Sequence, residues 1–467
     1  MFFDGLKRNK CLLIASFTII CIACENKTAT LGLPDFPQIQ LNGEIDVLTM
    51  SGSMTYFLYK SEPKGYEYEL LEDFASAYGL QINVHLVENE TQLTEKLLAG
   101  EGDLIMYNLA ETNEGKELLH YCGHTMINHQ VLIQRNNRNE KPLADVPELI
   151  GKEVWVIHDS RYARRLTNLN EEIGGGINIK IIEQDSVTVE DLIEKVAKNE
   201  IPYTIGNLDM AKLNKTYFNN LNISLPVSHP QRSSWAVRKD SPGLATVLNH
   251  WFRQNAKSPR YQGIMKRYFQ MSKMPGGAPA PFLDEHHISP YDDLFRQSAQ
   301  LLNWDWRLLV SISYQESKFY TDRVSWAGAT GLMGLMPKTA QAFGLSPDSL
   351  SDPAGSIRAA TLLLQRLNRS FSSIEDKEER IKFILAAYNV GASHINDAQA
   401  LAEKYDKNPS VWEDHVEECL KMKSRPEYYN DPVVKQGYCR ATETVNYVRS
   451  VMERWRYYQE KMPDTKK

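Results

Sequence analysis

The hydrophobic pattern of this chain of 467 residues changes once, and that change limits the folds that the chain can adopt. Before residue 270, short apolar runs alternate with amphipathic segments, as in Ile45–Met50, Tyr66–Tyr78 and Ile82–Val87. After Ser289, the patterned segments all carry apolar residues at helical spacing. Alternating strands and helices form a parallel sheet that is covered by helices on both faces. The sequence therefore predicts a multidomain protein, with an α/β part followed by an all-α part.

The α/β part contains two sets of strands and helices, which indicates two lobes. Gly79 and Gly100 follow two helical segments of the first set and can end them. We expect this first set at Ile45–Met50, Tyr66–Tyr78, Ile82–Val87, Thr91–Ala99 and Leu104–Met106. The second set is predicted at Val154–Ile157, Ile179–Ile182, Val189–Lys198, Tyr203–Ile205 and Ser234–Val237. The helical segments Pro242–Asn255 and Arg260–Phe269 complete a bilobed domain over residues 44–270.

Residues 271–288 are rich in Pro and Gly and have no periodicity, so we expect an interdomain linker there. An all-α domain over residues 289–467 should follow this linker. Its helices are predicted at Tyr291–Leu301, Trp306–Ser317, Lys338–Phe343, Ala354–Leu367, Lys377–Asn389, Ile395–Tyr405 and Ala441–Gln459.

The N-terminus has the composition of a targeting segment. Basic residues at positions 7, 8 and 10 precede the apolar run Cys11–Ala23, which is too short to span a bilayer as a helix. Small Ala23 lies before Cys24, and the segment resembles a bacterial lipoprotein signal. This resemblance implies a signal peptide at residues 1–23, a lipid on Cys24, a tether at residues 24–43 and an outer-membrane location facing the periplasm. An ordinary secretory signal is the alternative.

The cysteines that remain after this signal are few. Two of the six cysteines lie within the signal and Cys24 would carry the lipid, so Cys122, Cys419 and Cys439 are left. An exported chain meets oxidising conditions, and we expect a disulfide between Cys419 and Cys439. The alternative is that all three are reduced and buried.

Composition and residue spacing argue against several partners. The formal net charge of −6 gives no basic surface that would favour nucleic acid. The cysteines that remain after the signal form no CxxC motif, and no His/Cys cluster has metal-ligand spacing. His286 and His287 are interpreted as a solvated pair in the linker. We therefore expect neither a metal nor another cofactor.

A carboxylate occupies an apolar helical position in the second domain. Leu309, Ile312 and Glu316 lie on one stripe of the predicted helix Trp306–Ser317. Burial disfavours the charged form of a carboxyl group and raises its pKa. A carboxyl that stays protonated near neutral pH can donate a proton to a leaving oxygen, as the acid does in glycoside cleavage. The alternative is a solvated carboxylate at a fraying helix end.

Four short motifs around this carboxylate indicate a family. ESKF at Glu316 is followed by a glycine-rich GATGLM segment, by AAYNVG at residues 386–391 and by ETVNYV at residues 443–448. Together, in this order, they resemble the lysozyme-like catalytic domain of the family 1 lytic transglycosylases. The resemblance implies non-hydrolytic cleavage of the MurNAc–GlcNAc bond of peptidoglycan. Glu316 would act first as acid and then as base, and the product would be a 1,6-anhydromuramoyl end.

The resemblance also implies roles for residues around the acid. Tyr388 would hold Glu316 through its hydroxyl, and Asn389 would support the wall of the cleft. Ser325 would form hydrogen bonds near the acid or the N-acetyl group of the substrate. Taken without the resemblance, each of these residues would be interpreted as structural.

Three further residues are assigned to the substrate in the same way. Met336 would pack against sugar, although core filling is common for methionine. Glu443 would bind polar groups of sugar or peptide, although a carboxylate at a helix N-terminus is also favoured by the helix dipole. Tyr447, one turn further on, is a substrate-side candidate that could also be packing only. Gly334 departs from the family, which commonly has glutamine there, and this predicts altered sugar contacts.

The first domain resembles the periplasmic solute-binding proteins of the amino-acid-binding type. In those relatives an arginine and an aspartate clamp the ligand, and the matching positions here are Gly115 and Asn207. Loss of both charges argues against tight binding of a free amino acid. Tyr56 could still cover a ligand. We therefore expect this domain to regulate catalysis by binding a muropeptide fragment or a similar small ligand.

Two other functions remain open from the sequence. The chain could be a non-enzymatic solute-binding lipoprotein whose second domain grips the cell wall. It could also be a lysozyme-type muramidase that uses Glu316 as acid, which would need a second carboxylate to activate water. Asp322 is the nearest candidate for that second group.

Overall fold

The computed structural model describes residues 34–60, 62–136, 141–183, 187–271 and 287–463. The predicted signal, Cys24, the first part of the tether and most of the predicted linker lie outside these residues. Residues 34–467 form one compact unit. Within the described ranges, no helix combines the length and apolarity that a membrane crossing requires.

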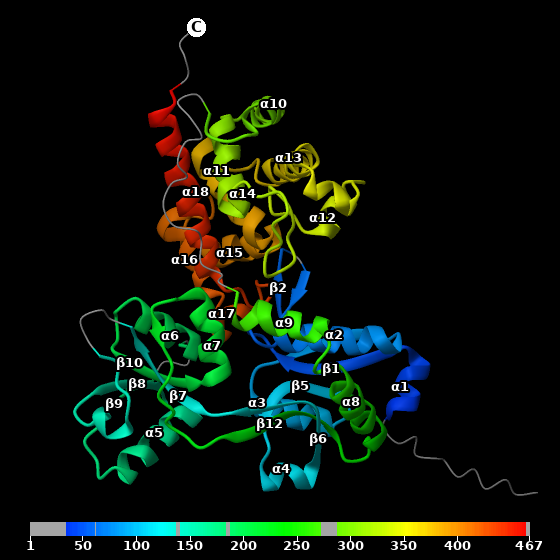
Figure 1. Cartoon of the computed structure of the whole chain (residues 1–467), viewed down its shortest axis with the longest axis vertical. Helices are drawn as coiled ribbons and strands as arrows, with labels where there is room; N and C mark the ends of the chain where they lie inside the picture. The colour runs from blue at the N-terminus through cyan, green and yellow to red at the C-terminus, as the bar shows by residue number, and fades with distance from the viewer. Residues whose placement is uncertain (1–33, 61, 137–140, 184–186, 272–286, 464–467) are drawn as a thin grey trace, which may run out of the picture. The chain divides into compact units, whose positions relative to one another are not determined.

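The first lobe is built on a mixed sheet of five strands in the order β4-β1-β5-β12-β6 (Figure 1). The first three strands are parallel, while β12 runs antiparallel to both β5 and β6. Their bounds are β1 Glu44–Met50, β4 Gln81–Val87, β5 Leu104–Ala110, β6 Leu119–Asn128 and β12 Gln231–Arg238. The helices of this lobe are α1 Phe36–Asn42, α2 Tyr66–Tyr78, α3 Glu90–Leu98, α4 Asn113–Leu118, α8 Pro242–Asn255 and α9 Pro259–Phe269.

The second lobe has a sheet of its own, in the order β11-β7-β10-β8-β9. The chain enters it from β6 through a single residue, His129, and returns to the first lobe in β12. The strands are β7 Gln130–Arg135, β8 Glu153–Ile157, β9 Asn178–Ile182, β10 Tyr203–Asn207 and β11 Leu221–Asn222. The helices are α5 Arg161–Glu172, α6 Val189–Ala197 and α7 Leu208–Tyr217, with a short 3-10 turn at Val146–Leu149.

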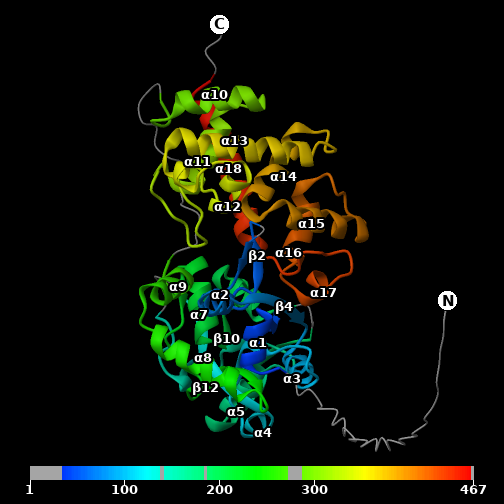
Figure 2. The same ribbon diagram turned by 90° about the vertical axis from the view of Figure 1, so that its right-hand side faces the viewer.

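The second domain is helical, as predicted. Its central helix is α11, which packs against α10 and α18, while α14 packs against α13, α15 and α18 (Figures 1 and 2). The long helices are α10 Asp292–Leu302, α11 Trp306–Ser317, α13 Pro353–Ser370, α14 Lys377–Val390, α15 Ala392–Lys404 and α18 Ala441–Lys461. The short helices are α12 Pro337–Ala342, α16 Glu417–Met422 and α17 Pro426–Tyr429, with tight turns at Pro347–Ser351 and Trp412–Val416.

Part of the segment predicted as a tether is folded. Helix α1 begins after Asp35 and buries Phe36 and Ile39 in the core of the first lobe. The Asp35 carboxylate also accepts hydrogen bonds from the backbone amides of Gly243 and Leu244 at the start of α8. The tether prediction was therefore wrong for these residues, because two apolar side chains in a polar segment are enough to dock a short helix.

A hairpin of the first domain reaches the helical domain (Figure 2). It consists of β2 Phe57–Tyr59 and β3 Glu62–Lys64, and Lys60 in its turn has φ 50°. The Lys60 amide donates to the carbonyl of Val390 at 3.0 Å, and the His394 Nε2 donates to the carbonyl of Leu58 at 3.0 Å. The two domains are therefore joined by backbone hydrogen bonds at this hairpin.

The joint between the domains is also apolar. The ring of Trp326 in the helical domain packs against two tyrosines. Its centroid lies 5.3 Å from that of Tyr59 and 5.8 Å from that of Tyr268. Trp326 and Tyr438 belong to the buried apolar cluster of the first lobe. Buried aromatic contacts of this kind stabilise an interface beyond the area that they remove from water. We conclude that side chains of the two predicted domains pack into a shared core. The sequence analysis, which treated the domains as separate, did not predict this.

The predicted disulfide is not formed. Cys122, Cys419 and Cys439 are all buried free thiols. Cys419 lies on the inner face of α16 and Cys439 before α18, and both belong to the apolar core of the helical domain. Burial raises the pKa of Cys419 to about 11 and that of Cys439 to about 12. The alternative interpretation, small buried hydrophobic residues, describes all three.

We predict that a chain beginning at Pro34 contains three free thiols per molecule, Cys122, Cys419 and Cys439. Titration with a thiol reagent should count three in denaturant and almost none in the folded protein, because burial keeps the thiols protonated and out of reach. A count of one in denaturant, without reductant, would show that Cys419 and Cys439 are paired after all.

Candidate active site

Glu316 lies in the last turn of α11, where the apolar stripe of the helix ends. The side chains of Leu309 and Ile312 on that stripe are buried in the helical core. Lys318 and Phe319 then adopt positive φ values of 55° and 68°, so the chain leaves the helix sharply after the acid. The Glu316 side chain is only 10% exposed. It therefore occupies a protected position and not a solvated helix end.

A lysine of the first domain faces this acid. Lys60 Nζ lies 3.8 Å from Glu316 Oε1 and donates a hydrogen bond to the carbonyl of Gly334 at 3.0 Å. The same amine lies 5.4 Å from the ring centroid of Tyr388. Lys60 was not predicted from the sequence, because the motifs around Glu316 lie in the other domain and the hairpin was not predicted.

Two tyrosines surround the carboxyl group, but not as predicted. The Tyr388 hydroxyl donates to the carbonyl of Met333 at 2.7 Å, so the predicted hydrogen bond from Tyr388 to Glu316 was wrong. The Tyr447 hydroxyl instead lies beside the carboxyl group of Glu316 and lowers the pKa of that group. Neither this hydroxyl nor Glu316 Oε1 has a hydrogen-bond partner of good geometry within the described part of the chain. A ligand group could therefore complete the hydrogen bonding of both.

The environment of Glu316 favours its protonated form. Burial raises the pKa of this carboxyl group. The Lys60 charge, the Tyr447 hydroxyl and the Arg323 charge lower the same pKa, but their effect is smaller than that of burial. Two other carboxyl groups of the helical domain differ from that of Glu316, because hydrogen bonds and nearby cations lower the pKa values of Asp305 and Asp431. The site can therefore hold a proton close to a bound substrate.

Ser325 and Met336 shape the glycine-rich segment that follows the acid. The Ser325 hydroxyl accepts from the Ala329 amide at 3.0 Å, and the Ser325 amide donates to the Ala329 carbonyl at 2.7 Å. Met336 is 3% exposed and precedes α12, so in this structure it fills the core. A substrate role for either side chain stays a prediction.

Asn389 and Glu443 connect α14 and α18 near the hairpin. The Asn389 side-chain oxygen accepts from the Thr444 hydroxyl at 2.7 Å, in a buried position. Glu443 lines a small pocket together with Tyr59 and Trp326. Asn389 thus joins α14 to α18, and Glu443 lies beside the residues of β2 in the lining of that pocket. The second acid proposed for a hydrolase, Asp322, is exposed in the loop after α11.

Gly334, the departure from the family pattern, lies against the acid itself. A Cβ added at this position would be 2.0 Å from Glu316 Oε2. The prediction of altered sugar contacts remains a prediction, but the structure adds a direct steric relation between residue 334 and the acid.

The first domain has a cleft of about 470 Å³ between its lobes. Asn207 lines it, while Gly115 does not; a Cβ at Gly115 would lie 2.0 Å from the Tyr121 hydroxyl. Tyr56, predicted to cover a ligand, is absent from the lining, and its ring instead packs against Tyr68 at 5.2 Å. Other charged side chains line the cleft: Glu67, Glu90, Arg161, Arg164, Glu190 and Asp209. The cleft is therefore lined by charged side chains, although neither Gly115 nor Asn207, which match the ligand-clamping residues of the relatives, carries a charge.

Glu67 lies at the floor of this cleft and is fully buried. Its carboxylate accepts hydrogen bonds from the Trp235 indole and from the Asn108 side chain. Burial raises the pKa of Glu67 to about 8, against the lowering effect of those two donors. The cleft can therefore change its charge near neutral pH.

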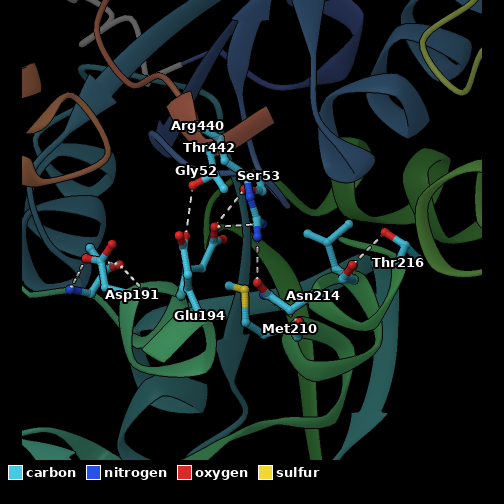
Figure 3. A network of polar contacts seen from close by, with 12 residues as sticks. Gly52, Ser53, Asp191, Glu194, Met210, Asn214, Thr216, Arg440 and Thr442 are labelled. Carbon is cyan, nitrogen blue, oxygen red and sulfur yellow. Dashed lines mark hydrogen bonds and ion pairs between the residues drawn. The ribbon is translucent and has the colours of Figure 1, made fainter. Parts of the chain in front are cut away.

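Glu190 at the start of α6 joins the cleft to the helical domain. Its Oε2 accepts from the Ser53 hydroxyl at 2.9 Å and the Tyr438 hydroxyl at 3.1 Å, and pairs with Arg440 at 3.2 Å. Figure 3 shows Arg440 and Thr442 meeting side chains of the first domain; there, Arg440 also bonds Asn214. One carboxylate thus contacts both lobes and the segment that leads into α18.

The described residues contain no group of three or more His, Cys, Asp or Glu that could hold a metal ion. Residues 293–411 match the transglycosylase SLT domain, and residues 47–271 match the bacterial extracellular solute-binding proteins, family 3. These two matches show the class of each domain: a domain similar to solute-binding proteins precedes a domain that matches the transglycosylase SLT model.

Proteins named membrane-bound lytic murein transglycosylase F are similar to this chain along most of its length. The chain is 29% identical to the protein of Desulfosudis oleivorans, over 89% of this chain and 90% of that protein. The identity to the protein of Pseudomonas fluorescens is also 29%, over 96% of this chain and 90% of that protein. The chain therefore has the architecture of these proteins, and both the predicted fold class and the predicted resemblance are confirmed.

Solved structures match the first domain. An ancestral cationic amino acid solute binding protein covers 50% of this chain and 99% of its own, with 15% identity and a TM-score of 0.43. A mutant of ArgBP from T. maritima covers 50% of this chain and 98% of its own, with 18% identity and a TM-score of 0.40.

We predict that Lys60→Met moves the basic limb of the pH profile for glycan cleavage to higher pH. The Lys60 charge lowers the pKa of Glu316, so its removal raises that pKa and keeps the acid protonated further into the basic range. Release of soluble fragments from murein sacculi across pH measures this. Lys64→Met is the control, because Lys64 lies on the same hairpin and pairs with Glu62 at 3.8 Å. Identical profiles for the two variants would contradict the prediction.

Proposed function

We propose that this chain cleaves the β-1,4 bond between MurNAc and GlcNAc in peptidoglycan without water, in the remodelling and turnover of the cell wall. The observation that carries this proposal is the position of Glu316, a carboxyl group with a raised pKa in a protected site of the SLT domain. Similarity to proteins named lytic murein transglycosylase F supports the same reaction and substrate.

In the proposed reaction, Glu316 donates its proton to the glycosidic oxygen, and the bond from that oxygen to C1 of MurNAc breaks. The N-acetyl group of MurNAc stabilises the positive charge that develops at C1. Glu316, now a carboxylate, accepts the proton of the C6 hydroxyl, whose oxygen closes on C1 to give the 1,6-anhydro end. A single residue thus serves as acid and then as base, which requires a pKa near the working pH.

Neighbouring residues have supporting roles in this proposal. The Tyr447 hydroxyl assists the carboxyl group directly, because it lies beside Glu316 and lacks another partner of good geometry among the described residues. Tyr388 holds the carbonyl of Met333 and so fixes the glycine-rich turn. Asn389 fixes the wall of the site through Thr444. Ser325, Met336 and Glu443 remain candidates for contacts with substrate.

We predict that Glu316→Gln lowers the formation of 1,6-anhydromuramoyl products by about 100-fold or more, because an amide cannot transfer the proton. Mass spectrometry of digested murein sacculi measures these products. Asp322→Asn is the matched control, since Asp322 is an exposed acid of the following loop, and it should leave the products unchanged.

The same experiment separates the alternative functions. Reducing-end products would show a lysozyme-type hydrolase, and their loss in Asp322→Asn would identify the second acid. The absence of any product from the wild-type protein would favour a binding protein that grips the wall.

We also propose that the first domain regulates this reaction by binding a muropeptide fragment in the cleft between its lobes. The support comes from Glu190, which lines the cleft and contacts Tyr438 and Arg440 of the helical domain. Charged side chains of both signs in the cleft suit a peptide with ammonium and carboxylate groups. Movement of the lobes would therefore be transmitted to the segment before α18.

We predict that stem peptides bind the full chain with a measurable heat and change its rate of murein cleavage. Calorimetry with stem peptides and with free amino acids, followed by the cleavage assay at saturating peptide, measures both effects. Heat from none of these compounds would remove the proposed regulatory role, whatever the outcome for catalysis.

We propose finally that a lipid on Cys24 anchors the chain to the outer membrane, facing the periplasm. The support is the sequence of the first 24 residues, together with relatives that are named membrane-bound.

A further inference from the structure

The backbone of Gly334 lies in contact with the side chain of Glu316. A Cβ added to Gly334 would lie 2.0 Å from Oε2 of Glu316, 2.7 Å from its Cδ and 3.0 Å from its Cβ. Real Cβ atoms essentially never approach other heavy atoms this closely. The carboxyl group therefore occupies space that any residue other than glycine would fill.

The glycine-rich turn that carries Gly334 is fixed on several sides. Backbone hydrogen bonds in both directions join Thr330 and Leu335 at 2.8 and 3.1 Å. The carbonyls before Gly334 accept from buried hydroxyls, Leu332 from Ser317 at 2.8 Å and Met333 from Tyr388 at 2.7 Å. The turn is thus held by groups of α11 and α14.

The Glu316 carboxyl is by contrast the end of a flexible side chain, and its Oε1 has no hydrogen-bond partner of good geometry in the described structure. A clash with the end of a flexible side chain is relieved when that side chain rotates to another rotamer. A side chain at position 334 would therefore displace the acid and leave the turn in place.

We propose that Gly334 is a positioning residue for the cleavage reaction: its missing side chain leaves the space in which the Glu316 carboxyl lies beside Lys60 and Tyr447. This inference rests on the proposed function of Glu316 as acid and base. It adds that the position of the Glu316 carboxyl group depends on residue 334 as well as on α11, the helix that carries Glu316.

Several groups face the carboxyl and would be affected by its displacement. They are Lys60 and Tyr59 on the hairpin, Arg323 in the loop after α11, Tyr388 on α14 and Tyr447 on α18. Lys60 opposes the raised pKa of Glu316 most strongly. Displacement away from Gly334 also moves the carboxyl away from Lys60, whose amine is bonded to the Gly334 carbonyl. The pKa of Glu316 should then rise.

The test compares Gly334→Ala with Gly344→Ala in the full chain. Gly344 has φ +70° and nothing within 4 Å of an added Cβ, whereas Gly334 has φ +61° and the clash. Both substitutions therefore carry the same left-handed backbone strain, and only the first meets Glu316. Gly334→Ala should lower kcat by about tenfold or more with an unchanged KM, because a small misplacement of a reacting group is costly. Its basic pH limb should move to higher pH, while Gly344→Ala should keep the profile of the wild type.

A double-substitution cycle provides the second measurement. Aspartate is shorter than glutamate by one methylene, so its carboxyl oxygens end near the position of the Glu316 Cδ and do not reach that of Oε2, the closest contact of the added Cβ. In a Glu316→Asp background, Gly334→Ala should therefore lower kcat by a smaller factor than in the wild type. Should Gly334→Ala fail to fold, Gly334→Asn and Gly344→Asn allow the same comparison, because asparagine tolerates a left-handed backbone.

Equal kcat values and pH profiles for Gly334→Ala and Gly344→Ala would overturn the inference. A raised KM with an unchanged kcat would also overturn it, because residue 334 would then act on substrate binding. Wild-type protein that forms no anhydro product would instead overturn the proposed function. A crystal structure of Gly334→Ala then still decides whether the carboxyl is displaced.

Discussion

The burial of one carboxyl group at the end of α11 is the constraint on which the site depends. Burying a carboxylate in a protein is unfavourable unless it is paired or protonated. Here the group has one cation at 3.8 Å, a tyrosine hydroxyl nearby and an oxygen without a partner of good geometry among the described residues. The unfavourable environment raises the pKa of Glu316 and so favours its protonated form. A fully satisfied carboxylate at this position would be more stable and chemically inert.

The first domain contributes directly to this environment. Lys60 reaches Glu316 from the hairpin, and the backbone of the hairpin is bonded to α14 and α15 through Val390 and His394. His394 is buried, and its Nδ1 accepts from Lys423, which fixes Nε2 as the donor to the hairpin. Glu190 makes a second connection, from the cleft between the lobes. The solute-binding domain and the helical domain therefore contact each other through charged side chains at two places, Lys60 at Glu316 and Glu190 at Arg440.

The sequence predicted elements whose patterns are local. The bounds of α2, α8 and α11 agree with the predicted segments, because each has a regular apolar stripe and a clear end. The acid was also predicted, since Glu316 lies on such a stripe. Strand β6 and the antiparallel pairing of β12 were not predicted, because pairing between distant strands leaves no local pattern. Lys60 was missed for the same reason. The predicted hydrogen bond of Tyr388 and the predicted Cys419–Cys439 disulfide were wrong. Each depends on where side chains point in space, and a sequence pattern does not determine that.

The central claim is that Glu316 is held in a place where its protonated form is favoured. The most direct test is the pKa of its carboxyl group, measured by carbon-13 NMR of glutamate-labelled protein and assigned by comparison with Glu316→Gln. The account predicts a Glu316 resonance that titrates above the ordinary pKa of a glutamate side chain, about 4.3. Titration of Glu316 at that ordinary value, or below it, would contradict the account.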